Sequence, residues 1–182
     1  MQRFYSTVTE LNFFTLSSNS LLFNQPCPHC QCADQWVSHG FNYSQSGEVR
    51  GKRIVCCARF GKQGCGKTIA LYLASMLPKR RYALDTLFRF ICALIQGKTV
   101  ERAYYHALKH PHYSQRQAYR WLNALYKKIG TFRTQFGRQT EYENKAQYRS
   151  KRLSTLLPTL KQCVTRWPEL RGYHTTFNDA FC

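Results

Sequence analysis

Six of the nine cysteines lie between residues 27 and 65, where their spacing suits the coordination of a metal ion. The segment CPHC at 27–30 has the C-x2-C spacing, in which a tight turn directs two thiolates toward one point. A second pair about 25 residues later, across a hairpin, would complete tetrahedral coordination by four sulfurs. Cys65 offers one of these two ligands, and either Cys56 or Cys57 offers the other.

Successive residues of a strand point to opposite faces, so only one of Cys56 and Cys57 can face the CPHC turn. We expect Cys56 to do so, with Cys57 as the alternative and Cys32 as a spare. A β unit of this size buries too little apolar surface to fold alone, and bound zinc would stabilise it. Buried cysteines also occur as small hydrophobic residues, but two groups within one basic hairpin favour metal. The preferred ligands of one Zn²⁺ ion are Cys27, Cys30, Cys56 and Cys65.

The same region also matches a nucleotide-binding motif. Residues 61–68, GKQGCGKT, fit the phosphate-binding loop G-x-x-x-x-G-K-[ST], and Ile69–Leu77 after them could form a helix. An NTPase also needs a carboxylate at the end of a second buried strand to hold magnesium. None of the acidic residues after Thr68 ends an apolar, strand-like run, and this interpretation leaves CPHC without a role. A small P-loop NTPase is therefore the alternative to the zinc site.

The elements that must position these residues change in kind along the chain. The cysteine-rich part predicts short strands at 35–39 and 53–60, separated by a polar turn around 44–51. From Leu84 to Ile95 apolar residues recur at helical spacing, and Gly97 ends the pattern. Residues 1–25 are expected to be an extended, weakly structured lead-in, and 144–163 a helix that contains Pro158.

Two further helices have the layout of a helix-turn-helix. One begins after Thr99 as its N-cap and ends before residues 110–111. The next begins after Ser114, with Gln117 completing a capping box, and is expected to end at Gly130. Arginine and glutamine near the start of a recognition helix suit base edges in the major groove. The candidate DNA contacts are Ser114, Gln115, Arg116, Gln117, Tyr119 and Arg120, with Lys79, Arg80 and Arg81 on the phosphates.

The charge of the chain indicates a polyanionic partner. The protein carries 27 Lys+Arg against 9 Asp+Glu, a formal charge of +18, and residues 47–182 hold 26 of the basic side chains. Such a surplus repels itself unless a polyanion neutralises it, which favours nucleic acid. The sequence contains neither a secretory signal nor an apolar run long enough to span a bilayer. We therefore expect a cytoplasmic, nucleoid-associated protein without a membrane partner, whose thiols stay reduced.

With these residues in hand, the sequence resembles bacterial mobile-element proteins that join an N-terminal zinc ribbon to a helix-turn-helix. The matching segments are CPHC at 27–30, RIVCCARFGKQGCGKTI at 53–69, LPKRRYALD at 77–85 and the helix from Ser114 to Trp121. Together they extend over roughly residues 27–128, about half of the chain. GCGKT resembles the second zinc knuckle of that family, which usually has arginine at the position of Lys67. The resemblance implies the four zinc ligands above, double-stranded DNA as a partner, and possible association with a transposase.

These observations predict an α+β chain with a small β zinc ribbon, a helix-turn-helix region and C-terminal helices. The expected divisions are 1–25, 26–78, 79–130 and 131–182, and the role of the last is open. The chain offers no metal-binding carboxylate triad for strand transfer, so we expect a sequence-specific DNA-binding protein, either the DNA-binding part of a transposase or a transposition helper or regulator, and not an enzyme. The further alternative is a zinc-containing adaptor for RNA or protein.

Overall fold

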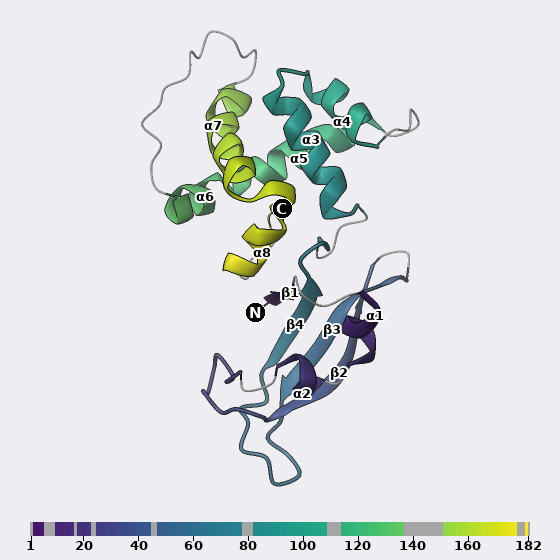
Figure 1. Cartoon of the computed structure of the whole chain (residues 1–182), viewed down its shortest axis with the longest axis vertical. Coiled ribbons are helices and arrows are strands. Elements are labelled where there is room, and N and C mark those ends of the chain that lie inside the picture. Colours follow the sequence, from purple (N-terminus) through teal and green to yellow (C-terminus); the bar gives the residue numbers. More distant parts are fainter. Residues whose placement is uncertain are drawn as a thin grey trace. The chain divides into compact units, whose positions relative to one another are not determined.

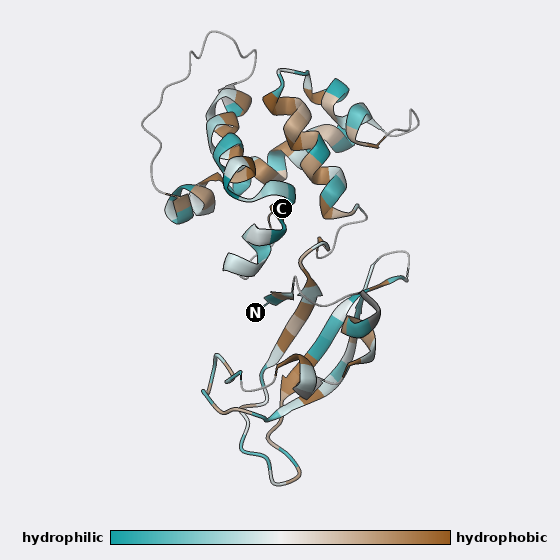
Figure 2. Ribbon diagram, in the orientation of Figure 1, coloured by the Kyte–Doolittle hydropathy of each residue, from teal (hydrophilic) through white to brown (hydrophobic). Residues whose placement is uncertain are grey.

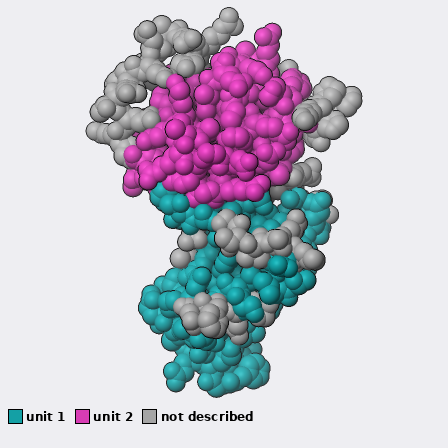
Figure 3. Space-filling view, in the orientation of Figure 1, with its two compact units in different colours: residues 1–81, 174–179 teal, residues 82–173, 180–182 magenta. Residues whose placement is uncertain are grey.

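The computed structural model describes residues 2–5, 10–16, 18–22, 25–44, 47–77, 82–108, 114–136, 151–177 and 181. A mixed sheet forms from the N-terminal part of the chain and helices follow it (Figure 1), so the expected α+β class is confirmed. The chain divides into two compact units (Figure 3): unit 1 is residues 1–81 with 174–179, and unit 2 is residues 82–173 with 180–182.

The sheet of unit 1 is built around one antiparallel hairpin. Strand β2 (Trp36–Tyr43) pairs with β3 (Val49–Cys56), and the N–H of Ser44 donates to the carbonyl of Glu48 at 2.8 Å to close the turn. The expected turn at 44–51 was too long. Gly51 belongs to β3 and not to the turn. A Cβ at this position would lie 2.5 Å from the Leu71 carbonyl oxygen of the neighbouring strand. Glycine here permits close approach of two strands.

The other two strands were not expected from the sequence. Strand β4 (Thr68–Leu73) pairs antiparallel with β3, and β1 (Gln2–Tyr5) pairs parallel with β4, which gives the order β1-β4-β3-β2. In β4 the side chains of Ile69, Leu71 and Leu73 are buried on one face, and on the other face Tyr72 is buried as well and stacks on Phe4 of β1.

The prediction of a weakly structured lead-in over residues 1–25 was wrong. Besides β1, this segment forms helices α1 (Glu10–Thr15) and α2 (Ser18–Leu21). Phe13 and Leu22 are fully buried and share one core with Ile54 and Leu71 of the sheet. The N-terminal segment therefore supplies part of the apolar surface that a three-stranded hairpin unit alone lacks.

Unit 2 is helical. Helix α3 (Leu84–Ile95) has the predicted bounds, and Gly97 after it adopts φ +83°, a conformation that favours glycine. It is followed by α4 (Val100–Leu108), α5 (Gln115–Lys127), α6 (Ile129–Phe136), α7 (Lys151–Arg166), the 3₁₀ helix η2 (Pro168–Leu170) and α8 (Arg171–Phe177), of which residues 174–177 belong to unit 1. Hydrophobic and hydrophilic residues alternate along α3 and α7 (Figure 2).

Two expectations for the helices need correction. Gly130 does not end the third helix: α5 stops at Lys127, and Gly130 lies inside α6, which begins at Ile129. The C-terminal helix expected at 144–163 is described only from Lys151 and extends to Arg166, with Pro158 inside it. None of the described helices has the length and apolar character that crossing a membrane requires.

Candidate metal centre and nucleic-acid interface

The turn that carries the first two cysteines is held by its own backbone. The N–H of Gln31 donates to the Cys27 carbonyl at 2.8 Å, and the N–H of Cys27 donates to the Cys32 carbonyl at 2.9 Å. The N–H of His29 points at Cys27 Sγ, 3.5 Å away. Backbone N–H groups directed at a sulfur stabilise its thiolate form, which is the form that binds metal.

The second pair of cysteines comes from the end of β3 and the loop after it. The N–H of Gly66 donates to the Cys56 carbonyl at 2.7 Å, and the N–H of Gly64 donates to the Cys57 carbonyl at 2.8 Å. A Cβ on Gly64 would lie 2.2 Å from that same carbonyl oxygen. The glycine at 64 therefore allows the loop to fold back against β3 and to bring Cys65 beside Cys56.

The four sulfurs of Cys27, Cys30, Cys56 and Cys65 lie within 4.8 Å of one another. Cys27 Sγ and Cys65 Sγ are 3.7 Å apart, and Cys30 Sγ and Cys56 Sγ are 3.6 Å apart. Sulfurs bound to one tetrahedral zinc at about 2.3 Å lie about 3.8 Å from each other. The cluster thus has the donor set and the spacing of a closed, four-coordinate metal site.

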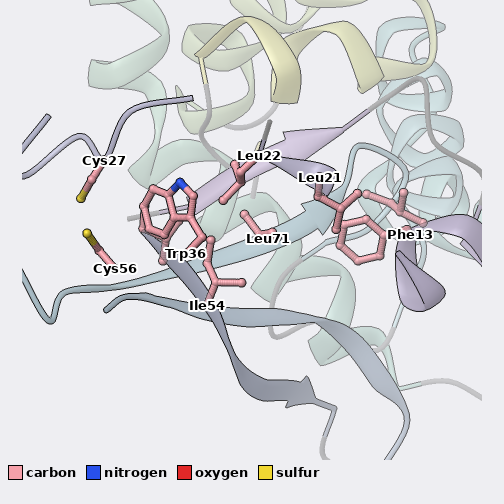
Figure 4. Close-up of a cluster of buried hydrophobic side chains, with 10 residues drawn as sticks. Phe13, Leu21, Leu22, Cys27, Trp36, Ile54, Cys56 and Leu71 are labelled. Carbon is pink, nitrogen blue, oxygen red and sulfur yellow. The ribbon is translucent and has the colours of Figure 1, made fainter. Parts of the chain in front are cut away.

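The hydrophobic core of unit 1 forms one side of this cluster. Cys27 and Cys56 are fully buried, and Figure 4 shows their side chains pointing toward each other beside the indole of Trp36. Burial raises the pKa of Cys56 to about 12, whereas a backbone hydrogen bond from Cys32 is the main cause that lowers the pKa of Cys30 to about 6. A cation between the sulfurs favours the thiolate at every position.

The two remaining cysteines of the region face elsewhere. Cys57 is buried, but its sulfur lies beside the backbone of Arg59, accepting from the N–H at 3.4 Å. Cys32 Sγ donates to the carbonyl of Gln63 at 3.4 Å. The structure therefore brings together Cys56 and not Cys57 with the other three thiols, in agreement with the alternation of side chains along β3.

The phosphate-loop interpretation of residues 61–68 disagrees with this geometry. A phosphate loop uses free backbone N–H groups and leads into a helix. Here the N–H groups of Lys62, Gln63, Gly64 and Gly66 donate to other groups of unit 1, and Ile69 lies in a strand. We therefore interpret GKQGCGKT as the turn that carries Cys65.

In unit 2, helix α5 is anchored through one aromatic residue. Trp121 is buried, and its ring makes edge-on contacts with Tyr82, Phe90 and Tyr104 at centroid distances of 4.9, 5.3 and 5.2 Å. These partners come from the segment before α3, from α3 and from α4. The same face of α5 also buries Ala118, Leu122 and Leu125. The opposite face of the helix is therefore the one exposed to solvent.

Helix α5 carries four of the nine predicted DNA contacts with described side chains, namely Arg116, Gln117, Tyr119 and Arg120. Arg116 and Arg120 are exposed, and the Gln117 side-chain oxygen accepts from Arg120 Nη1 at 3.4 Å. The hydroxyl of Tyr119 donates to the Glu101 carboxylate of α4, and this bond is the main cause that lowers the pKa of Glu101. Tyr119 is thus engaged with its own unit.

Four of the candidate DNA contacts are not placed by the structure. Lys79, Arg80 and Arg81 lie outside the described residues, and so does the side chain of Gln115. A basic residue outside the candidate set does contact α5: Arg152 of α7 donates to Asn123 Oδ1 at 2.7 Å, and its guanidinium lies over the Tyr126 ring, 5.8 Å from the centroid. No local pattern predicts this contact, because its partners are 29 residues apart.

Ser114 is the N-cap of α5, as expected. Its hydroxyl accepts from the N–H of Arg116 at 3.3 Å. We expect Ser114→Ala to lower the free energy of unfolding by about 1 kcal/mol, because one N–H of the first turn loses its acceptor. Urea denaturation followed by helical circular dichroism measures the change. Thr134→Ala, which removes a hydroxyl bonded inside α6, is the control, and an equal loss in both variants would contradict the capping role.

The chain was compared with protein-family models, with curated proteins and with solved structures, and none of these comparisons gave a match. Two features of the described residues bear on function: the four-sulfur cluster of unit 1 and the exposed face of α5.

Proposed function

We propose that this chain is a zinc-containing protein that binds duplex DNA sequence-specifically and serves a mobile genetic element. Unit 1 acts as a zinc ribbon and α4 with α5 as a helix-turn-helix. The observation that carries the proposal is the exposed face of α5, which presents Arg116 and Arg120 and belongs to a helix without any acidic residue.

The charge of unit 2 supports DNA as the partner. Residues 82–136 contain nine Lys+Arg and two acidic residues. Both acids are engaged: Asp85 pairs with Arg89 at 3.2 Å, and Glu101 accepts from Tyr119. Neither acid belongs to α5, and Glu101, whose carboxylate lies against it, is bonded to Tyr119, so an approaching phosphate backbone meets the cationic Arg116 and Arg120 there. Neutralising those phosphates releases counterions, so affinity is expected to fall steeply with salt.

The zinc ion in this proposal has a structural role. Four thiolates from Cys27, Cys30, Cys56 and Cys65 fill a tetrahedral coordination sphere and leave no position for water or substrate. The metal would hold the loop after β3 against the CPHC turn. Cysteine-only coordination favours zinc among the common divalent ions, because soft thiolates suit it and hard oxygen ligands are missing.

In the proposed complex, α5 lies in the major groove with its N-terminal half against base edges. An arginine there pairs bidentately with guanine O6 and N7, and a glutamine pairs with adenine. Arg116, the second residue of the helix, is the leading candidate for a base contact. Tyr119 keeps its bond to Glu101, which links α5 to α4 and helps to set the direction of the helix.

Selection of bound sequences from a randomised duplex library tests this function. We expect the protein to enrich one site, and Arg116→Ala to lose discrimination at one position of it by about 1–3 kcal/mol. Arg133→Ala removes the same charge from the exposed surface of α6 and is the matched control. It should weaken matched and scrambled duplexes alike or not at all.

The contrary outcomes are distinct. Equal weakening of matched and scrambled DNA by Arg116→Ala would remove α5 from the role of recognition helix. Preference for structured RNA over every duplex in the same competition would favour the adaptor alternative.

The mobile-element part of the proposal rests on the sequence resemblance and has its own test. The chain is expected to assist a transposase that supplies the strand-transfer chemistry. If so, the gene should lie beside a transposase reading frame or between inverted repeats, and the selected DNA site should occur in those repeats. A selected site without any counterpart near the gene would argue for a regulator of another kind.

A further inference from the structure

Phe60 is the most exposed large hydrophobic residue in the described part of the chain. Its side chain is 94% exposed, whereas the next, Tyr43, is 61% exposed. Phe60 lies in the loop of residues 57–67 between β3 and β4, the loop that carries Cys65 (Figure 1). An aromatic ring that stays in water contributes none of the hydrophobic free energy that its burial would add to the stability of the fold.

The backbone around Phe60 is held in place by hydrogen bonds. The N–H of Lys62 donates to the Arg59 carbonyl at 3.2 Å, and the N–H of Arg59 donates to Cys57 Sγ at 3.4 Å. Phe60 adopts φ 58° and Gly61 adopts φ 77°. Positive φ is unfavourable for a bulky residue, and such strain concentrates where a side chain must be presented to a ligand. The hydrogen-bonded backbone of the loop therefore directs the ring of Phe60 toward solvent.

The loop of residues 57–67 that carries the ring contains three cationic residues and no acidic residue. Arg59 and Lys67 are exposed, and Lys62 is partly exposed. Between Glu48 and Asp85 the chain contains no acidic residue at all. A single exposed ring among cations does not have the apolar area of a protein-binding core. It does have the two components of nucleic-acid binding by stacking: an aromatic face for a base and cations for the flanking phosphates.

We propose that Phe60 stacks on a nucleobase of the bound DNA, at an unpaired or locally unstacked position, while Arg59 and Lys67 contact the adjacent phosphates. This inference rests on the proposed DNA-binding function and adds a second contact, made by the metal-anchored loop of unit 1. Every base has a π face, so stacking depends little on base identity. The loop would therefore recognise an unpaired or unstacked position in the DNA and not a particular sequence.

The test uses the full-length, zinc-loaded protein and the DNA site that it selects, once intact and once with a single unpaired base. We expect tighter binding to the second duplex, and Phe60→Ala to lower that affinity about tenfold or more. Phe60→Trp should retain it, and Phe60→Leu should behave as the alanine variant. Since the ring is exposed, all variants should keep the zinc content and thermal stability of the parent protein.

Two controls separate stacking from charge and from general loss of an exposed ring. Arg59→Ala should reduce the slope of log affinity against log salt by about one, whereas Phe60→Ala should leave that slope unchanged. Tyr43→Ala removes an exposed aromatic side chain of β2 and should not alter binding.

The result that overturns the proposal is equal affinity of Phe60→Ala and the parent protein for both duplexes, while Arg116→Ala still impairs discrimination. The proposed function then stands and only the stacking contact falls. Equal behaviour of the leucine and tryptophan variants would likewise exclude stacking. Binding of the parent protein to anionic lipid vesicles, lost in Phe60→Ala, would assign the ring to a membrane instead. If the parent protein bound no duplex, both proposals would fail.

Discussion

Replacement of Cys56 by serine is expected to release the metal ion and unfold the sheet of unit 1. A structural zinc contributes about 10–16 kcal/mol of binding free energy, which is as large as the whole stability of a typical domain. Cys56 Sγ lies 3.6 Å from Cys30 Sγ at the edge of the core. Its loss removes one of the four ligands and leaves the other three thiols without a complete coordination sphere. Elemental analysis should fall from about one zinc per chain to near none.

The neighbouring cysteine is the matched control for this variant. Cys57→Ser changes the same atom one residue later, but that sulfur faces the backbone of Arg59, so the zinc content should be retained. Chelation of the parent protein should reproduce the Cys56→Ser spectrum, and added zinc should reverse it. Zinc loss in Cys57→Ser with retention in Cys56→Ser would show that the ligand set is wrong.

The second large effect is expected in unit 2, where Trp121→Ala should lower the free energy of unfolding by about 3–5 kcal/mol. The indole is nearly fully buried and contacts rings from three separate segments, so truncation leaves a cavity that no single neighbour fills. Urea denaturation followed by helical circular dichroism measures the loss. The same variant should also lose DNA discrimination, because α5 loses its anchor.

Two readouts make this prediction specific. The zinc content of Trp121→Ala should equal that of the parent protein, because the metal cluster belongs to unit 1. Tyr119→Phe, on the exposed face of the same helix, removes only the bond to Glu101 and should cost far less. A loss below about 1 kcal/mol for Trp121→Ala would contradict the packing described for α5.

Local patterns were sufficient for the elements whose causes are local. The bounds of α3, the caps at Thr99 and Ser114 and the preference for Cys56 over Cys57 follow from periodicity, side-chain oxygens and alternation within a few residues. The four-cysteine set was predictable for the same reason, because both pairs of cysteines flank the same end of the β2–β3 hairpin. Roles in DNA binding remain predictions for the residues of α5.

The parts that the sequence did not reveal depend on distant partners. Strand β1 has four residues and exists only through pairing with β4, and α1 and α2 are too short to form without the core beneath them. Gly130 was expected to stop a helix because glycine often does so. Instead Phe132 of α6 packs on Tyr173 and Phe181, and this tertiary contact outweighs the propensity of one glycine.

The parallel pairing of β1 with β4 also affects how the chain is made. Gln2 lies beside Ala70, so 68 residues must be synthesised before the first strand meets its neighbour. The hairpin and the thiol cluster close over shorter loops and are expected to form earlier. Until β1 pairs with β4, the Phe4 side chain stays exposed to solvent, and the outer edge of β4 can pair with another polypeptide.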